Sequence, residues 1–144
     1  MGFLLDVNVL VALMWPSHDD HKKVQHWFRG NSEKGWATCN VTQAGFVRVV
    51  SNPAFSSDAV SPTEALNLLR NNVMHAHHQF WPGDITFLKA VEPFSKKLVG
   101  HRQVTDAYLL GLALHKHGKL VSLDRGILQL ISERGMERDL LALL

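Results

Sequence analysis

Residues 3–13 read FLLDVNVLVAL, so one carboxylate, Asp6, and one amide, Asn8, interrupt a segment that is otherwise apolar. The apolar residues before Asp6 predict a short buried strand, and those after Asn8 predict a short helix that stops at Pro16. A carboxylate in a buried segment is costly unless it accepts hydrogen bonds, pairs with a positive charge or binds a cation. Asp6 is therefore the first candidate functional residue.

Strand and helix patterns alternate along the rest of the chain. Further strands are predicted at residues 35–39, 77–82 and 119–124, and helices at 17–30, 40–53, 61–73, 84–98, 102–118 and 125–135. Residues 138–144 fit a last edge strand or a helix, with the strand favoured. This alternation predicts an α/β fold whose short, mostly parallel sheet is flanked by helices. No repeat or linker divides the 144 residues, so we expect a single domain over residues 1–144.

Several helix starts carry capping signals. Ser61, with a glutamate three residues later, predicts a capping box, and Ser17 is the expected cap of the helix at 17–30. The helix at 40–53 is expected to open at Asn40 or Thr42, and Asn40 with Gln43 also has the spacing of a capping box.

Composition excludes some classes of protein without naming a function. The formal net charge of +2 is too small to identify a nucleic-acid-binding protein. The longest apolar run is shorter than the ~18 residues of a membrane span, and it lacks the basic leader and cleavage site of a signal peptide. The single cysteine, Cys39, excludes an internal disulfide and suits a reducing compartment. We therefore expect a cytoplasmic protein that does not enter the membrane.

Three aspartates occupy comparable places in this pattern. Asp6 and Asp124 end predicted strands, and Asp106 lies in the first turn of the apolar helix at 102–118. Taken singly, Asp124 also fits a helix cap and Asp106 a favourable acid at a helix N-terminus. Taken together at one edge of a parallel sheet, three carboxylates repel one another unless a cation compensates their charge. Oxygen ligands alone suit Mg²⁺ or Mn²⁺, which assist phosphodiester hydrolysis.

Other motifs are weaker. The runs HDDH and HAHH lack the ligand spacing of a zinc site, and the four tryptophans lie at spacings typical of packing. A phosphatase with the pattern D-x-D after its first strand would need an acid where this chain has Asn8. The three aspartates therefore remain the leading candidates.

Four segments in order, LLDVNVLVAL, TQAGFVRVVSNP, TDAYLLGLAL and LVSLDRGI, resemble the PIN domain of VapC-type toxins over about residues 3–132. The resemblance implies a three-layer PIN-like fold. It also implies a Mg²⁺-dependent endoribonuclease, in which Mn²⁺ can substitute and a Mg²⁺-activated water cleaves RNA. As the toxin of a type II toxin–antitoxin module, the chain would form a homodimer and a heteromeric complex with a VapB-like antitoxin.

Carried over by position, the family's first, third and fourth acids fall on Asp6, Asp106 and Asp124. The resemblance implies that these three bind the metal and act in catalysis. The family's second acid, usually a glutamate, is replaced here by Gln43, which brings no charge but can orient a ligand or water. Gln43 is therefore included among the predicted catalytic residues, although the site has three charged ligands rather than four.

Three further positions are expected to support the site. Asn8 matches the polar residue that often follows the family's first acid, and Ser122 matches a small hydroxyl residue near the end of the last matched strand. Arg48 matches an arginine expected to pair with a carboxylate or phosphate. Because Gln43 lacks charge, an alternative stays open: a catalytically weakened or inactive PIN fold that binds RNA or an antitoxin without cleaving.

Overall fold

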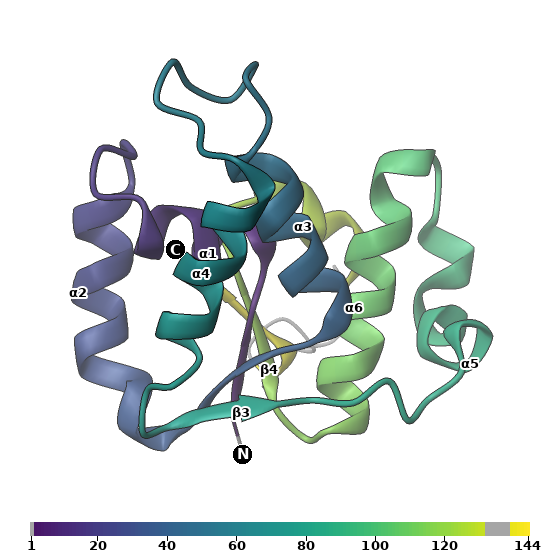
Figure 1. The fold of residues 1–144 in the computed structure, drawn as a ribbon. Coiled ribbons are helices and arrows are strands. Elements are labelled where there is room, and N and C mark those ends of the chain that lie inside the picture. The colour runs from purple at the N-terminus through teal and green to yellow at the C-terminus, as the bar shows by residue number, and fades with distance from the viewer. Residues whose placement is uncertain (1, 132–138) are drawn as a thin grey trace.

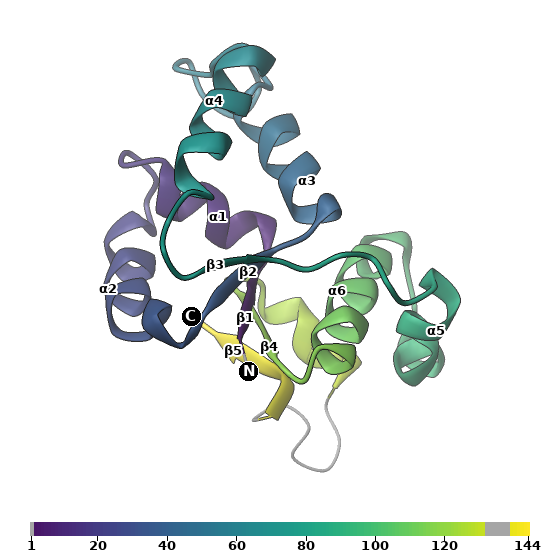
Figure 2. The ribbon, with the colours of Figure 1, turned by 60° about the horizontal axis from the view of Figure 1, so that its bottom comes forward.

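A five-stranded, wholly parallel sheet forms the centre of the molecule (Figures 1 and 2), which the computed structural model describes over residues 2–131 and 139–144. Its strands are β1 (Phe3–Leu5), β2 (Trp36–Thr38), β3 (His78–Phe80), β4 (Lys119–Ser122) and β5 (Leu141–Leu143). Their order across the sheet is β3-β2-β1-β4-β5. The first strand is thus central, and the last lies at an edge, where the sequence predicts it.

Helices cover both faces of this sheet. The α-helices are α1 (Val7–Met14), α2 (His21–Asn31), α3 (Asn40–Val50), α4 (Pro62–Asn72), α5 (Phe87–Val91) and α6 (Val104–His115). Short 3₁₀ helices are η1 (Ser32–Lys34), η2 (Glu92–Lys97), η3 (His101–Gln103) and η4 (Arg125–Leu130). Figure 2 shows α1 to α4 on one side of the sheet and α5 and α6 on the other. The expected three-layer α/β fold is confirmed.

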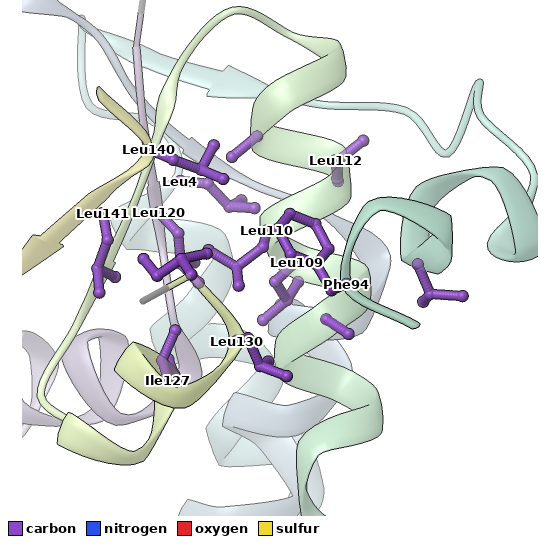
Figure 3. Packing of buried hydrophobic residues seen from close by; sticks show 14 of the residues in the cluster. Leu4, Phe94, Leu109, Leu110, Leu112, Leu120, Ile127, Leu130, Leu140 and Leu141 are labelled. Atoms are coloured by element: carbon purple, nitrogen blue, oxygen red, sulfur yellow. The ribbon is translucent and has the colours of Figure 1, made fainter. Parts of the chain in front are cut away.

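Alternation along the strands divides the core in two. Leu4 and Leu120 face α6, where they pack with Leu109, Phe94 and Ile127 (Figure 3). The neighbouring strand residues face the other way and pack under α1 to α4; these are Phe3, Leu5, Trp36 and Val121. Because successive side chains of a strand point to opposite faces, a fully apolar strand is needed to fill both layers.

Two glycines allow helices to approach closely. A Cβ at Gly111 of α6 would overlap the carbonyl group of Ala90 in α5. A Cβ at Gly45 of α3 would lie 2.5 Å from Cγ2 of Val7, the first residue of α1. The second contact matters for function, because it places α3 directly against the helix that Asp6 begins.

Some predicted boundaries are wrong. Helix α2 begins at His21 rather than near Ser17, because the segment before it forms a turn in which His18 Nδ1 accepts a hydrogen bond from Asp20 N (3.0 Å). Such a local side-chain bond competes with helix formation. The capping box of α3 uses Cys39 and Thr42, whose Oγ1 accepts from Cys39 N (3.0 Å), rather than the expected Asn40–Gln43 pair.

The two later helices are shorter than predicted. The segment 84–98 forms α5, capped by Thr86, and then a 3₁₀ helix that starts at Glu92 and Pro93. Proline cannot donate the hydrogen bond that an α-helix would need there. Residues 125–130 are 3₁₀ helix that ends at the cap residue Ile131, and the rest of the predicted segment 125–135, like residue 138, lies outside the described residues.

The predicted capping box at Ser61 and the predicted packing of the tryptophans are confirmed. The Ser61 capping box is present, with Ser61 Oγ accepting from Glu64 N (3.2 Å). Trp36 and Trp81 are buried, whereas Trp15 and Trp27 are partly buried and pack edge-on against Phe55 and Phe3. Within the described ranges, every helix is too short or too polar to cross a lipid bilayer.

Candidate active site

Asp6 and Asp124 meet because the strands that precede them are parallel neighbours. In the register of β1 and β4, Leu5 lies opposite Val121, so both strands end at the same edge of the sheet. Asp6 begins α1, and its Oδ1 accepts a hydrogen bond from Val7 N (2.7 Å). Asp124 begins η4, and its Oδ1 accepts from Gly126 N (2.8 Å). Both residues therefore lie at the same edge of the sheet, and each uses one carboxylate oxygen, Oδ1, to cap a helix.

Asp106 joins them from the other layer. It lies in the first turn of α6 and lines, with Asp6 and Asp124, a cavity of about 330 Å³ that we call the acidic cavity. The remaining walls include Asn8, His18, Val49 and Phe55. Within residues 2–131 and 139–144, no three His, Cys, Asp or Glu side chains are already gathered as closely as a metal site requires. The carboxylates thus share a cavity without forming a closed cage.

Ser122 and Asn8 hold Asp6 in place. Ser122 Oγ donates to Asp6 Oδ2 (2.7 Å) and accepts hydrogen bonds from Asn8 Nδ2 (3.3 Å) and Asp124 N (3.0 Å). Asn8 Nδ2 also lies 3.4 Å from Asp6 Oδ2, while Asn8 Oδ1 accepts from Leu123 N (3.1 Å). Only 7% of Asp6 is exposed, so this network supplies the polar partners that a buried carboxylate needs. Of the predicted supporting residues, Asn8 lines the acidic cavity, and Ser122 is buried behind it and contacts Asp6.

The electrostatics of the acidic cavity favour protons or a cation. Partial burial, with repulsion from Asp6 and Asp124, raises the pKa of Asp106 from its ordinary value of 3.8 to about 7. Burial also raises the pKa of Asp6, although hydrogen bonds from Ser122 and Val7 oppose this effect. Among the described residues, the ion pairs found involve Asp20 and Asp84 and none of these three aspartates. Among the residues that the structure describes, no ion pair therefore balances the negative charge of the acidic cavity.

Comparison with known proteins places the chain in a family. A PIN-domain family model matches residues 3–131. Ribonuclease VapC38 of Mycobacterium tuberculosis is 42% identical over 131 residues, which cover 91% of each chain. This chain belongs to the VapC family of PIN-domain ribonucleases. Ribonuclease VapC44 of the same species is 42% identical over 127 residues, covering 88% of this chain and 89% of the relative.

A solved structure has the same fold. The crystal structure of VapBC2 from Rickettsia felis, bound to a DNA fragment from their promoter, superimposes with a TM-score of 0.63. The match covers 100% of this chain and 99% of that chain at 11% sequence identity, so it supports the PIN fold and nothing finer. The predicted membership of the PIN-domain VapC family is confirmed by these matches.

Two predicted site residues lie elsewhere in this VapC family member. Gln43 and Arg48 line a groove of about 590 Å³ between α3 and α4, together with residues such as Leu66 and Leu69; we call it the α3–α4 groove. Gln43 Nε2 donates to Thr38 Oγ1 (2.9 Å), at the end of β2. Neither Gln43 nor Arg48 is among the residues that line the acidic cavity. The structure therefore brings together three of the four predicted catalytic residues.

The acidic cavity also includes residues that sequence reasoning did not select. His18, from the turn before α2, and Phe55, from the loop after α3, both line it. A second cavity, of about 400 Å³, shares Asp106 and Asp124 with the acidic cavity. We call it the glutamine cavity; its other lining residues are Val99, Gly100, Arg102, Gln103, Gly126 and Gln129. These six lie within seven positions of Asp106 or Asp124 in the sequence, which is the signal that would have found them.

Proposed function

We propose that this chain is a Mg²⁺-dependent endoribonuclease and the toxin of a type II toxin–antitoxin module. One observation carries the proposal: Asp6, Asp106 and Asp124, the family's acid positions, line one cavity whose charge no described side chain balances. The relatives named ribonuclease VapC, at 42% identity, support RNA as the substrate.

The residues at the acidic cavity fit a hard divalent cation. The three aspartates and Asn8 of the acidic cavity offer carboxylate and amide oxygens, the ligands that Mg²⁺ and Mn²⁺ prefer. The raised pKa values of Asp6 and Asp106 fit as well, because a cation would relieve the repulsion that favours their protonated forms. Asp6, Asp106 and Asp124 would hold the cation, and the open form of the acidic cavity leaves room for phosphate oxygens.

The chain's own residues do the positioning. Ser122 and Asn8 keep Asp6 Oδ2 oriented, while the helix-capping bonds occupy Oδ1 of Asp6 and Asp124. Asp106 requires deprotonation before it can serve as a ligand, and its pKa of about 7 makes that step easy near neutral pH. When bound, Mg²⁺ supplies positive charge to the phosphodiester and makes water a better nucleophile.

The test is cleavage of a mixed RNA pool by purified chain with Mg²⁺, with Mn²⁺ and with EDTA, alongside Asp6→Asn. A ligand that neutralises transition-state charge contributes several kcal/mol, so we expect Asp6→Asn to slow cleavage about a thousandfold. The matched control is Asp84→Asn. Asp84 pairs with His115 and Lys116 at the opposite end of α6 from Asp106, about 15 Å away by helix rise, and should leave cleavage unchanged.

Cleavage that survives both EDTA and Asp6→Asn would refute the proposal. Absence of cleavage by the wild-type chain would favour the second candidate, a PIN fold that binds RNA or an antitoxin without cutting. That candidate draws on Gln43, which stands where the family usually has a glutamate and lies in the α3–α4 groove.

We further propose a VapB-like antitoxin partner, a homodimer and a cytoplasmic location. The named VapC relatives support the toxin assignment, while the VapBC2 structure supports the fold. Light scattering of the purified chain, alone and mixed with the candidate antitoxin, measures both assemblies directly. A monomer that forms no complex would refute both.

A further inference from the structure

Asp106 and Asp124 line two cavities rather than one. Both belong to the acidic cavity and to the glutamine cavity, whose other lining residues differ. A strand of RNA whose scissile phosphate lies at the aspartates would therefore have space for a neighbouring nucleotide in the glutamine cavity. The volume of about 400 Å³ is within the range typical of small-molecule sites.

A chain of hydrogen bonds sets the direction of both glutamine side chains. Gln103 Oε1 accepts from the backbone N–H groups of Val99 (2.7 Å) and Gly100 (3.2 Å). Because these donors take the oxygen, the Gln103 amide nitrogen faces the other way and donates to Gln129 Oε1 (3.3 Å). The oxygen of Gln129 thus accepts one hydrogen bond, and the NH₂ group of Gln129, which can only donate, is left for a ligand.

Arg102 adds donors to the same wall. Its guanidinium carries five N–H donors and no acceptor, and it lines the glutamine cavity together with Gln129. In the part of the chain that the structure describes, neither the Gln129 NH₂ nor the Arg102 guanidinium has a hydrogen-bond or ion-pair partner. A ligand that contacts these two groups must therefore present hydrogen-bond acceptors to them.

We propose that the glutamine cavity is a nucleobase subsite in which Gln129 and Arg102 favour guanine over adenine. Guanine presents two neighbouring acceptors, O6 and N7, whereas adenine presents N7 beside an N6 donor. Single-stranded RNA offers its base edges freely for such recognition. This inference rests on the proposed function and names its substrate preference.

Gln129→Glu is the sharpest test. It retains an oxygen to accept from Gln103 and replaces the NH₂ donor by a second acceptor oxygen of nearly the same size. Wild type and variant would each cleave an RNA pool that is randomised around the cut, and sequencing of the fragment ends gives the base preference at each position. The matched control is Gln25→Glu, on α2, which lines neither the acidic nor the glutamine cavity.

We expect wild type and Gln25→Glu to prefer guanine over adenine about tenfold at one position beside the cut, the discrimination typical of a good donor pair. Gln129→Glu should lose this preference at that position and keep the preferences elsewhere. Arg102→Ala should weaken the same preference, with Arg29→Ala on α2 as its control.

Two results would overturn the inference. One is an unchanged guanine preference in Gln129→Glu. The other is a result for Arg102→Ala in which cleavage falls equally for all bases and depends less on salt. That behaviour is expected of a residue that contacts phosphate rather than a base. If the wild-type chain cleaves nothing, the proposed function fails, and the subsite is judged by binding. Asp6→Asn would then bind guanine-containing oligonucleotides more tightly than adenine-containing ones, and Asp6→Asn with Gln129→Glu would not.

Discussion

The acidic cavity and the α3–α4 groove are both lined by helix α3, yet they have opposite chemistry. Val49 lines the acidic cavity, and its neighbour in sequence, Arg48, lines the groove. Gln43 precedes Val49 by six residues, which at about 100° per residue places the two about 120° apart around the helix. The acidic cavity gathers three carboxylates that repel one another, whereas the groove combines apolar side chains with two amides and one guanidinium. A residue's place in a family motif thus does not decide which face of its helix it occupies.

Among the substitutions that test this contrast between the acidic cavity and the α3–α4 groove, Ser122→Ala is expected to change the rate of cleavage most. The change removes the 2.7 Å hydrogen bond to Asp6 Oδ2 and leaves a buried carboxylate with the longer contact to Asn8. Residues that orient a metal ligand contribute about 10- to 100-fold, so we expect a loss of that size in cleavage, measured by Mg²⁺ titration of the rate. Ser95→Ala, which removes an exposed serine bond on η2, is the control. Unchanged cleavage would show that Val7 N and Asn8 suffice to orient Asp6.

The next largest effect is expected from pH, through the ionisation of Asp106. The pKa of Asp106 in the folded chain, about 7, is above its ordinary value of 3.8, so the metal-free fold binds this proton more tightly than the unfolded chain does. Its contribution to stability is fully present below pH 3.8 and is lost as the pH rises through about 7. Mg²⁺ should offset that loss, because it replaces the proton as the compensating charge.

Thermal unfolding with and without Mg²⁺ at pH 6 and pH 8 measures this exchange. We expect Mg²⁺ to raise the melting temperature more at pH 8, and the apparent Mg²⁺ affinity to fall up to about tenfold per pH unit below 7. Asp106→Asn should remove most of this pH dependence. An equal Mg²⁺ effect at both pH values, in wild type and variant alike, would show that Asp106 is not a ligand.

The smallest effect is expected from Gln43→Glu. Because Gln43 lies in the α3–α4 groove and donates to Thr38, the added charge should change cleavage by no more than about threefold, as substitutions outside a site shift free energies by about 0.5 kcal/mol. Initial rates at saturating Mg²⁺ give the comparison, with Ala44→Ser on the same groove as control. A tenfold gain would instead place residue 43 at the metal and remove the distinction between the two regions.

Much of the fold could be predicted because buried parallel strands are recognisable as short apolar runs. Asp6 and Asp124 were found as site residues by the rule that the carboxyl ends of neighbouring parallel strands meet at one edge. The helix caps at Ser17 and Asn40 were wrong, because other nearby groups, His18 and Thr42, make the hydrogen bonds instead. Local signals compete with one another at helix ends, and the sequence does not rank them.

The sequence by itself determined the alternation of strands and helices, the buried carboxylate after the first strand and the family to which the chain belongs. These depend on the order and spacing of residue types, which survive any change of packing detail. Only the tertiary structure decided that Gln43 and Arg48 face the α3–α4 groove, that His18 and Phe55 reach the acidic cavity, and that Gln103 orients Gln129. The physical reason is that a helix presents its side chains according to how it is rotated against its neighbours, and contacts distant in sequence, such as that of Gly45 with Val7, set that rotation.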